Sequence, residues 1–328
     1  MTTEDTITVV GAGLMGAAIA TLCAAHGYAV VLTDKSEGML ESFPERASSI
    51  AHYLAGPSQT AEKILSRIEC SPSLEYSVRK ASLVQEAIHE NLEAKRELFG
   101  QLDSICARDV VLATNTSSFL LSEICENLPG RRRMIGIHYV SPAHLIRSVE
   151  IITASFTDLA LVEQAQEFLK SIDHVGIVCR ERPGFLINRI QYALKAEVQK
   201  LVEEGVASVE DIDTAVRLSI GPRLALWGPM MQEDLSTSKK TVLAVSEYLH
   251  RTTGEAHFAS SSVLRMLAER GQNGAMDKAG WYRWDASYDE IVRERDRQLG
   301  ELLDWLRKNE RLAALGAAGE NKHIHEGE

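Results

Sequence analysis

The chain has 328 residues, a length that predicts two domains of ordinary size. Its formal net charge of −11 excludes the strongly basic surface by which proteins bind nucleic acids. The five cysteines are scattered, and the segment Met1–Thr6 is polar and acidic, so we expect free thiols and no signal peptide. No apolar run approaches the length of a transmembrane helix. These features together predict a soluble cytoplasmic protein without a nucleic-acid or membrane partner.

The first elements of the chain alternate between strand and helix. Thr6–Val10 is a β-branched run that ends at a glycine, which is typical of a buried strand. A helix of small residues is expected from Leu14 to His26, and a second strand from Tyr28 to Thr33. This order of elements predicts a parallel sheet with right-handed crossovers.

The alternation continues to about Arg182. Residues 36–80 are expected to be mainly helical. Further short apolar runs predict strands at Ser82–Ala87, Val110–Ala113, Met134–Tyr139, Ser148–Ile152 and His174–Cys179. After Gly184 a long helix is expected to Glu204, and no strand pattern follows it. The sequence thus predicts an α/β fold in which an N-terminal, Rossmann-like doubly wound sheet (1–182) precedes an all-α C-terminal domain (183–312) and a disordered tail (313–328).

A glycine-rich turn joins the first strand to the first helix. Gly11, Gly13 and Gly16 fit the pattern G-x-G-x-x-G, with Leu14 and Met15 inside it. In dinucleotide-binding proteins the first glycine permits a tight turn, the second lets the backbone approach a pyrophosphate, and the third allows close helix–strand packing. A glycine turn without a ligand is the alternative, but the strand before it and the helix after it match the binding context.

Asp34 ends the second strand, 18 residues after Gly16. A carboxylate at that place accepts hydrogen bonds from ribose hydroxyls and repels a 2′-phosphate, so NAD is favoured over NADP. The adjacent Lys35 weakens this argument slightly, and an ordinary strand-end aspartate is the alternative. We expect NAD as the cofactor and no metal, because no HExxH motif or paired cysteine spacing is present.

Three further parts of the chain resemble the 3-hydroxyacyl-CoA dehydrogenase family. They are Glu86–Leu92 leading into Leu112–Ser118, Gly136–Pro142 leading to Val149 and Glu150, and Arg182–Arg189. With the glycine turn, the resemblance spans about residues 6–230. It implies an NAD-dependent oxidoreductase of fatty acid metabolism that acts at carbon 3 of a small-molecule substrate. It also implies that 1–182 binds NAD, and that 183–312 binds substrate and forms a homodimer.

The resemblance assigns catalytic roles to Ser117, His138, Glu150 and Asn188, whose intervals of 21, 12 and 38 residues match the family. A histidine can take the hydroxyl proton while hydride leaves the same carbon, and a carboxylate on its far nitrogen would fix its tautomer. Serine and asparagine can donate hydrogen bonds to the substrate oxygen. Each residue also has a purely structural alternative: a strand-end histidine, a solvated carboxylate, a turn serine and a polar residue of a first helical turn.

The same resemblance places Glu90, Lys95, Asn115, Ser117 and Ser141 at the cofactor. As charges on a helix surface, Glu90 and Lys95 have an ordinary alternative.

Two positions depart from the family pattern. Ser141 replaces the asparagine of the usual His-Phe-Phe-Asn-Pro motif. Arg223 stands in a segment that is usually neutral, a feature similar to the lambda-crystallin branch, whose activity is that of an L-gulonate 3-dehydrogenase, and to carnitine dehydrogenases. A guanidinium group there could hold a substrate carboxylate in a bidentate fork, and an interfacial ion pair is the alternative. Arg147 is a second candidate for that role.

Two activities therefore stay open. The substrate is either a 3-hydroxyacyl-CoA or a free 3-hydroxy acid such as gulonate. A non-catalytic, crystallin-like NAD-binding protein is a more distant alternative, because all four catalytic residue types are present.

Overall fold

The computed structural model describes residues 1–309, and the predicted tail 313–328 lies outside them. The chain divides into two compact units, Met1–Lys195 and the part from Ala196 onward. No helix in residues 1–309 is both long and apolar enough to cross a membrane.

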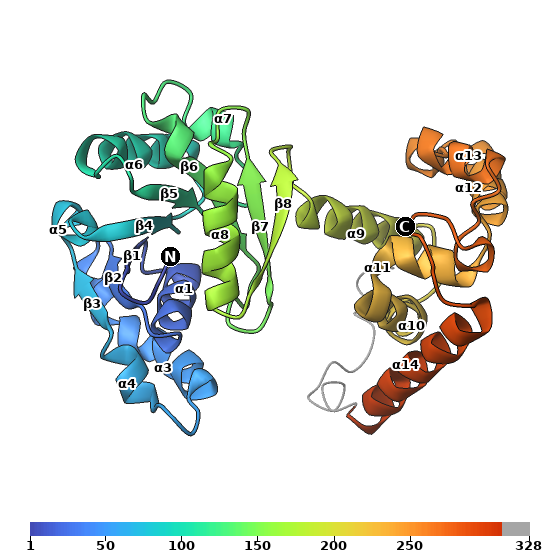
Figure 1. Ribbon diagram of the computed structural model, residues 1–328, viewed down its shortest axis with the longest axis horizontal. Helices are drawn as coiled ribbons and strands as arrows, with labels where there is room; N and C mark the ends of the chain where they lie inside the picture. The colour runs from blue at the N-terminus through green and yellow to red at the C-terminus, as the bar shows by residue number, and fades with distance from the viewer. Residues whose placement is uncertain (310–328) are drawn as a thin grey trace. The chain divides into compact units, whose positions relative to one another are not determined.

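An eight-stranded sheet forms the centre of the first unit, in the order β3-β2-β1-β4-β5-β6-β7-β8 (Figure 1). Neighbouring strands are parallel except β6 and β7, which are antiparallel. The order reverses beside β1, and in sheets of this kind ligands bind at such a switch point. The strands are β1 (Thr6–Val10), β2 (Ala29–Thr33), β3 (Ile68–Ser71), β4 (Ala81–Glu86), β5 (Val111–Thr114), β6 (Met134–Tyr139), β7 (Ser148–Thr153) and β8 (Val175–Arg180).

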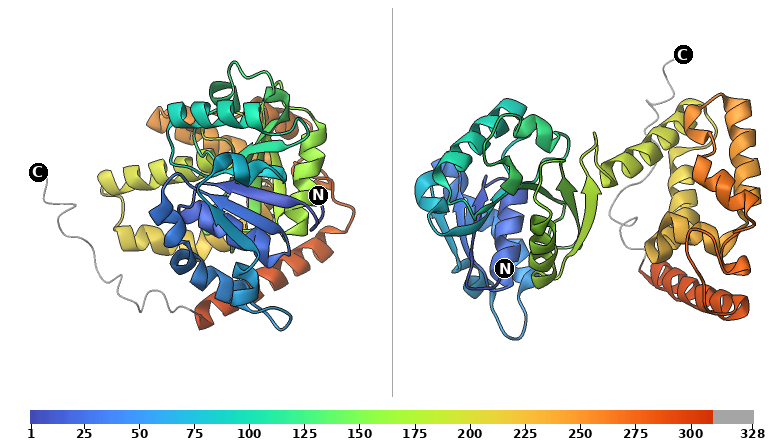
Figure 2. Two further views of the ribbon diagram at one scale, coloured as in Figure 1. Left: turned by 90° about the vertical axis from the view of Figure 1, so that its left-hand side faces the viewer. Right: turned by 45° about the horizontal axis from the view of Figure 1, so that its top comes forward.

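Helices cover both faces of this sheet, and the views in Figure 2 show the two layers from further sides. One core packs α1, α3, α4 and α8 against Val9 and Leu83, and the other packs α5, α6 and α7 against Val10 and Val84. Adjacent residues of a strand therefore pack into the cores on opposite faces of the sheet, because successive side chains of a strand point to opposite faces. The helices are α1 (Leu14–Ala25), α2 (Glu37–Glu41), α3 (Phe43–Leu54), α4 (Ala61–Leu65), α5 (Leu74–Val78), α6 (Leu92–Ile105), α7 (Leu121–Ile124) and α8 (Ala160–Ser171).

The described part of the second unit consists of helices joined by loops and has no strand, with α11 packed against α14 and α12 against α13 (Figure 1). Its first helix continues from the first unit. The helices are α9 (Ile187–Glu203), α10 (Val209–Ala215), α11 (Gly221–Ser236), α12 (Lys239–Thr253), α13 (Ser262–Glu269) and α14 (Tyr288–Lys308). The predicted α/β sheet followed by a helical domain is thus confirmed.

Two details differ from the sequence-based expectations. The strand β3 lies in a region expected to be helical; it is a short edge strand that exposes two of its four residues and therefore shows no apolar run. The β6–β7 pair is antiparallel, although the early β-α-β order predicted a parallel sheet. The first compact unit ends at Lys195 and includes the start of α9, which is hydrogen-bonded to β7; the domain division at residue 182 stays a prediction.

Candidate active site

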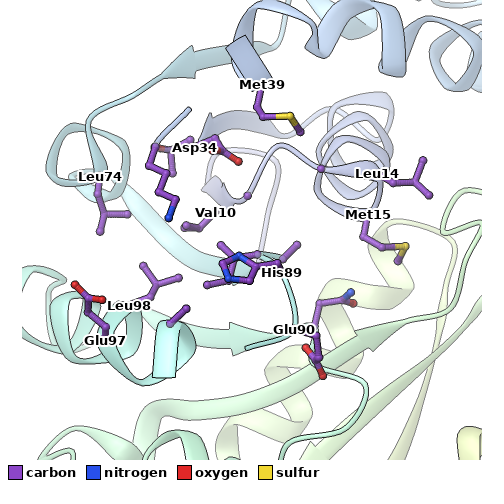
Figure 3. A pocket seen from close by; sticks show the side chains of 18 of the residues that line it. Val10, Leu14, Met15, Asp34, Met39, Leu74, His89, Glu90, Glu97 and Leu98 are labelled. Carbon is purple, nitrogen blue, oxygen red and sulfur yellow. The ribbon is translucent and has the colours of Figure 1, made fainter. Parts of the chain in front are cut away.

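A pocket of about 780 Å³ opens at the switch point of the sheet (Figure 3). This volume lies in the range of small-molecule and cofactor sites. In the view of Figure 3, Asp34 and Glu90 lie on opposite sides of His89, with Met15 near Glu90. The predicted cofactor residues that line the pocket are Gly11, Gly13, Leu14, Met15, Asp34, Glu90, Asn115 and Ser117.

The glycine turn forms one wall of this pocket, and its glycines have different roles. Gly11 has a φ of +107°, and a Cβ there would lie 2.5 Å from the carbonyl oxygen of Ala87. A Cβ at Gly16 would lie 1.7 Å from the carbonyl oxygen of Gly11, so this glycine lets α1 approach the turn. A Cβ at Gly13 would meet no atom within 4 Å. The chain is thus close-packed at the first and third glycines and open at the second.

The open glycine and the start of α1 fit a pyrophosphate group. Gly13 caps α1 without a side-chain hydrogen bond, so the first amides of the helix are not used by a capping side chain. Such amides, with the positive end of the helix dipole, bind phosphate oxygens. The carboxylate of Asp34 accepts hydrogen bonds from the amides of Ala12 and Ser36, at 2.8 and 2.9 Å, and so holds the turn in place beside the pocket.

We predict that alanine affects stability at one of these glycines and NADH binding at another. In Gly16→Ala, the added carbon displaces backbone, so the free energy of unfolding should fall by roughly 1–3 kcal/mol. In Gly13→Ala, the free energy of unfolding should change by less than about 1 kcal/mol, while NADH binding weakens about tenfold or more because a methyl group blocks the backbone approach. Urea unfolding and NADH fluorescence titration measure both quantities. Normal NADH affinity in Gly13→Ala would contradict the assignment of this wall to the pyrophosphate.

The antiparallel pairing of β6 and β7 joins His138 to Glu150. The two residues are directly opposite in the register, so their side chains lie on the same face of the sheet. His138 Nδ1 lies 2.6 Å from Glu150 Oε2, and both side chains are buried. His138 and Glu150 are twelve residues apart in the sequence, and they are in direct contact because the chain reverses direction between these two strands.

The other oxygen of Glu150 binds the start of α9. Burial acts to raise the pKa of Glu150, but hydrogen bonds from His138 and from the amides of Ile187 and Leu186 outweigh it, and the net shift is downward. The two amides each donate to Oε1 at 2.8 Å. Glu150 is therefore a carboxylate, whose buried charge faces hydrogen-bond donors on both oxygens. An ordinary solvated position is excluded for it.

A left-handed turn brings α9 to this carboxylate. Gly184 has a φ of +75° and Phe185 a φ of +47°, a conformation that costs a residue with a side chain roughly 1–2 kcal/mol. The Phe185 ring is buried, and its centroid lies 6.1 Å from that of the His138 ring. The turn thus packs an apolar ring beside the imidazole while it aims two amides at Glu150.

Ser117 and Asn188 meet beside this pair. Asn188 Nδ2 donates to the carbonyl oxygen of Ser117 at 3.1 Å, and both residues line a second pocket of about 340 Å³ with Tyr192. Asn188 lies at the start of α9, within the first compact unit. Ser117 lines both pockets, so the expected catalytic serine lies between the cofactor pocket and the second one.

Comparisons with known proteins match this arrangement to one family. Residues 6–182 match the NAD binding domain of 3-hydroxyacyl-CoA dehydrogenase, and residues 184–284 match the C-terminal domain. The mitochondrial hydroxyacyl-coenzyme A dehydrogenase of Homo sapiens is 34% identical over 289 residues, which are 85% of this chain and 90% of the human protein. The chain belongs to the 3-hydroxyacyl-CoA dehydrogenase family.

Solved structures agree with this assignment. A 3-hydroxyacyl-CoA dehydrogenase from Archaeoglobus fulgidus has a TM-score of 0.80 and 30% identity, over 92% of this chain and 99% of that one. A diketoreductase has a TM-score of 0.64 and 26% identity, over 87% of this chain and 100% of that one. This member of the family is an NAD-dependent oxidoreductase of the 3-hydroxyacyl-CoA dehydrogenase type.

Five predicted binding residues line neither pocket of this dehydrogenase: Gly16 and His138, which are described above, and Lys95, Ser141 and Arg223. Lys95 is buried below the pocket wall, and its ammonium group contacts Glu86 and Glu90, so a position on the helix surface is excluded for it. Ser141 is exposed and precedes a cis proline. Arg223 belongs to the second unit, where its Nε donates to the carbonyl oxygen of Ser219.

The second candidate for a substrate carboxylate is already engaged. Arg147 donates from Nη2 to Asp173 Oδ1 at 2.6 Å and from Nε to the carbonyl oxygen of the same residue, on the surface. This ion pair disfavours Arg147 as the substrate's anchor.

Sequence reasoning missed Glu86, although a signal was available. Glu86 is the last residue of β4 and is fully buried, with both carboxylate oxygens hydrogen-bonded. Like Asp34, Glu86 is a carboxylate at the carboxyl end of an apolar strand, and β4 lies at the switch point, where ligands bind. That position in the sequence was the available signal.

Proposed function

We propose that this dehydrogenase interconverts a 3-hydroxyacyl-CoA and its 3-keto form, with His138 as the general base and acid. The hydrogen bond between His138 and Glu150 carries the proposal. Glu150 is a carboxylate and can only accept, so the imidazole must donate its Nδ1–H to it. The Nε2 atom has no partner in residues 1–309 and is left with a lone pair for the substrate hydroxyl proton.

The bond changes balance around carbon 3. In oxidation the hydroxyl proton passes to His138 Nε2, the carbon–oxygen bond becomes double, and the hydrogen on carbon 3 leaves with its electron pair. NAD, when bound, supplies the acceptor for that hydride. In reduction the same ring returns the proton to the oxygen. Glu150 stabilises the imidazolium, which forms in oxidation and gives up its proton in reduction, because the carboxylate charge is fixed next to Nδ1.

Ser117 and Asn188 are proposed to stabilise charge on the substrate oxygen. Ser117 Oγ makes no hydrogen bond within the described residues, so it is available as a donor. One N–H of the Asn188 amide group holds the Ser117 carbonyl, and the other is left for the substrate. Donors fixed in place before the reaction stabilise developing charge without reorganisation.

A free 3-hydroxy acid is the second candidate substrate. Among the described residues of the second unit, no carboxylate pairs with Arg223, whose Nε donates to the carbonyl oxygen of Ser219. The guanidinium group is therefore available for a substrate carboxylate. A diketoreductase with this fold acts on dicarbonyl compounds, which supports a broader range of substrates for proteins of this fold.

A comparison of two substrates tests the proposal. NADH consumption with acetoacetyl-CoA and NAD reduction with L-gulonate should differ, with clear turnover of the thioester only. If the free acid is the substrate instead, Arg223→Gln should raise its KM roughly 10- to 100-fold, because a charge-assisted hydrogen bond is lost. Arg147→Gln serves as the control, since Arg147 is paired on the surface. Turnover of gulonate but not of acetoacetyl-CoA would contradict the acyl-CoA assignment.

We also propose a homodimer and a cytoplasmic location. The helices α9 and α14 have no buried residue in the chain, and their exposed apolar side chains include Ile190 and Trp305. Apolar helix faces of this kind are typical of subunit interfaces. Sedimentation equilibrium measures the mass, and a monomer at micromolar concentration would contradict the dimer.

A further inference from the structure

A buried ammonium group lies under the loops that line the cofactor pocket. Lys95, on α6, is 1% exposed. Its Nζ lies 2.6 Å from Glu86 Oε1 and 3.2 Å from Glu90 Oε2. Lys95 and Glu86 are both fully buried, whereas the Glu90 side chain is partly exposed. Removing the two buried charges from water has a large desolvation cost, which only close pairing and further hydrogen bonds offset. The hydrogen-bond partners of Glu86 and Glu90 therefore show which parts of the chain these charges hold in place.

Glu90 binds the loop that carries Ser117. Its Oε1 accepts hydrogen bonds from the amides of Ser117 and Ser118, at 3.1 Å each. The same oxygen accepts from the hydroxyls of Thr116 and Ser118, at 2.6 Å each. Burial acts to raise the pKa of Glu90, but the hydrogen bonds from Ser118, Thr116 and Lys95 outweigh it and the net shift of the pKa is downward. The group is therefore a carboxylate. In Figure 3 this carboxylate points away from the centre of the pocket.

Glu86 binds the start of the same loop and a second one. Its Oε2 accepts from the Thr114 hydroxyl at 2.5 Å, and its Oε1 accepts from the Ile88 amide at 2.7 Å. Ile88 lines the cofactor pocket, next to Ala87, which packs on Gly11. A single ammonium group thus connects the wall beside the glycine turn with the loop that carries Ser117.

We propose that Glu86 and Lys95 are positioning residues, which hold Ser117 at the reacting centre through Glu90 and Thr114. The inference rests on the proposed role of Ser117. Neither residue lines a pocket, so each acts through the loop. If Glu86 and Lys95 only stabilised the fold, their loss would lower the free energy of unfolding, and its effect on kcat would be the same with or without the Ser117 hydroxyl.

A charge-balanced variant tests the inference. Glu86→Gln/Lys95→Met removes one charge of each sign, so neither buried partner is left alone. Its kcat for acetoacetyl-CoA reduction should fall roughly 10²-fold, the effect of a displacement of about 1 Å at a catalytic group. In a Ser117→Ala background the same change should cost less than about threefold, because groups that act as one unit are not additive.

The second unit offers a matched control. Lys239 is also fully buried and lies 2.6 Å from Asp234 and 2.9 Å from Glu233. Asp234→Asn/Lys239→Met should therefore lower stability similarly, but its effect on kcat should multiply with that of Ser117→Ala. If the factors for the Glu86/Lys95 pair multiply in the same way, the positioning role is contradicted.

Hydrogen exchange separates this inference from the proposed role of Ser117. The amides of Ser117 and Ser118 should exchange at least about tenfold faster in Glu86→Gln/Lys95→Met, and unchanged in the Lys239 control, because their acceptor is displaced. Unchanged exchange would overturn the positioning role. Full turnover in Ser117→Ala together with faster exchange would remove Ser117 from catalysis and leave the positioning role intact.

Discussion

His138→Gln should lower kcat for acetoacetyl-CoA reduction about 10³-fold and leave the dissociation constant of NADH unchanged. The loss is that of a general acid placed at the reacting oxygen, whose contribution is typically 10²- to 10⁴-fold. NADH affinity should persist because His138 does not line the cofactor pocket. Steady-state kinetics and fluorescence titration measure the two quantities.

The control for this variant is His52→Gln. His52 is exposed on α3, and its ring contacts only the carbonyl oxygen of Ser48 within the described residues. It should behave as the wild type in both assays. Near-normal kcat in His138→Gln would remove the imidazole from proton transfer, and lost NADH binding would point to a structural role.

Glu150→Gln should lower kcat roughly 10²-fold and also change how stability depends on pH. Glutamine can present its amide group to His138 Nδ1, which favours the wrong tautomer, and it removes the charge that stabilises the imidazolium. The pKa of Glu150 is lowered from 4.5 in the folded chain, so the carboxylate stabilises the fold above that pH. This stabilisation is lost as the pH falls through the folded-state pKa.

The free energies of unfolding of the wild type and of Glu150→Gln should therefore differ most near neutral pH and become similar in acid. Urea unfolding above and below pH 4.5 measures this. Glu167→Gln, a change on the exposed side of α8, should leave the curve of the wild type unaltered. A difference between wild type and Glu150→Gln that grows in acid would contradict the pairing of Glu150 with His138 and α9.

Much of the fold follows from local patterns in the sequence. Short apolar runs predicted the strands from Met134 and from Ser148 to within a residue. The short strand Ile68–Ser71 was missed because it exposes two of its four residues and so shows no apolar run. The antiparallel pairing of β6 and β7 was missed because strand direction depends on the path of the connecting chain, which composition does not record.

The candidate site was partly predictable for similar reasons. The glycine turn and Asp34 are local signals, so both were found, and family spacing supplied His138 and Glu150. The burial of Lys95 was not predicted, because its helix is amphipathic and its partner Glu86 comes from a separate strand. Charged residues on a helix are usually exposed, and only the tertiary contacts reverse that expectation.

Recovery of activity by added imidazole tests the central claim most directly. In His138→Gly, the proton donor is removed and a space the size of the ring is left between Glu150 and Phe185. Imidazole in solution should restore NADH-dependent turnover in proportion to its concentration, and Glu150→Gln in the same chain should weaken that recovery. Turnover by His138→Gly at the wild-type rate, with imidazole making no difference, would contradict the claim.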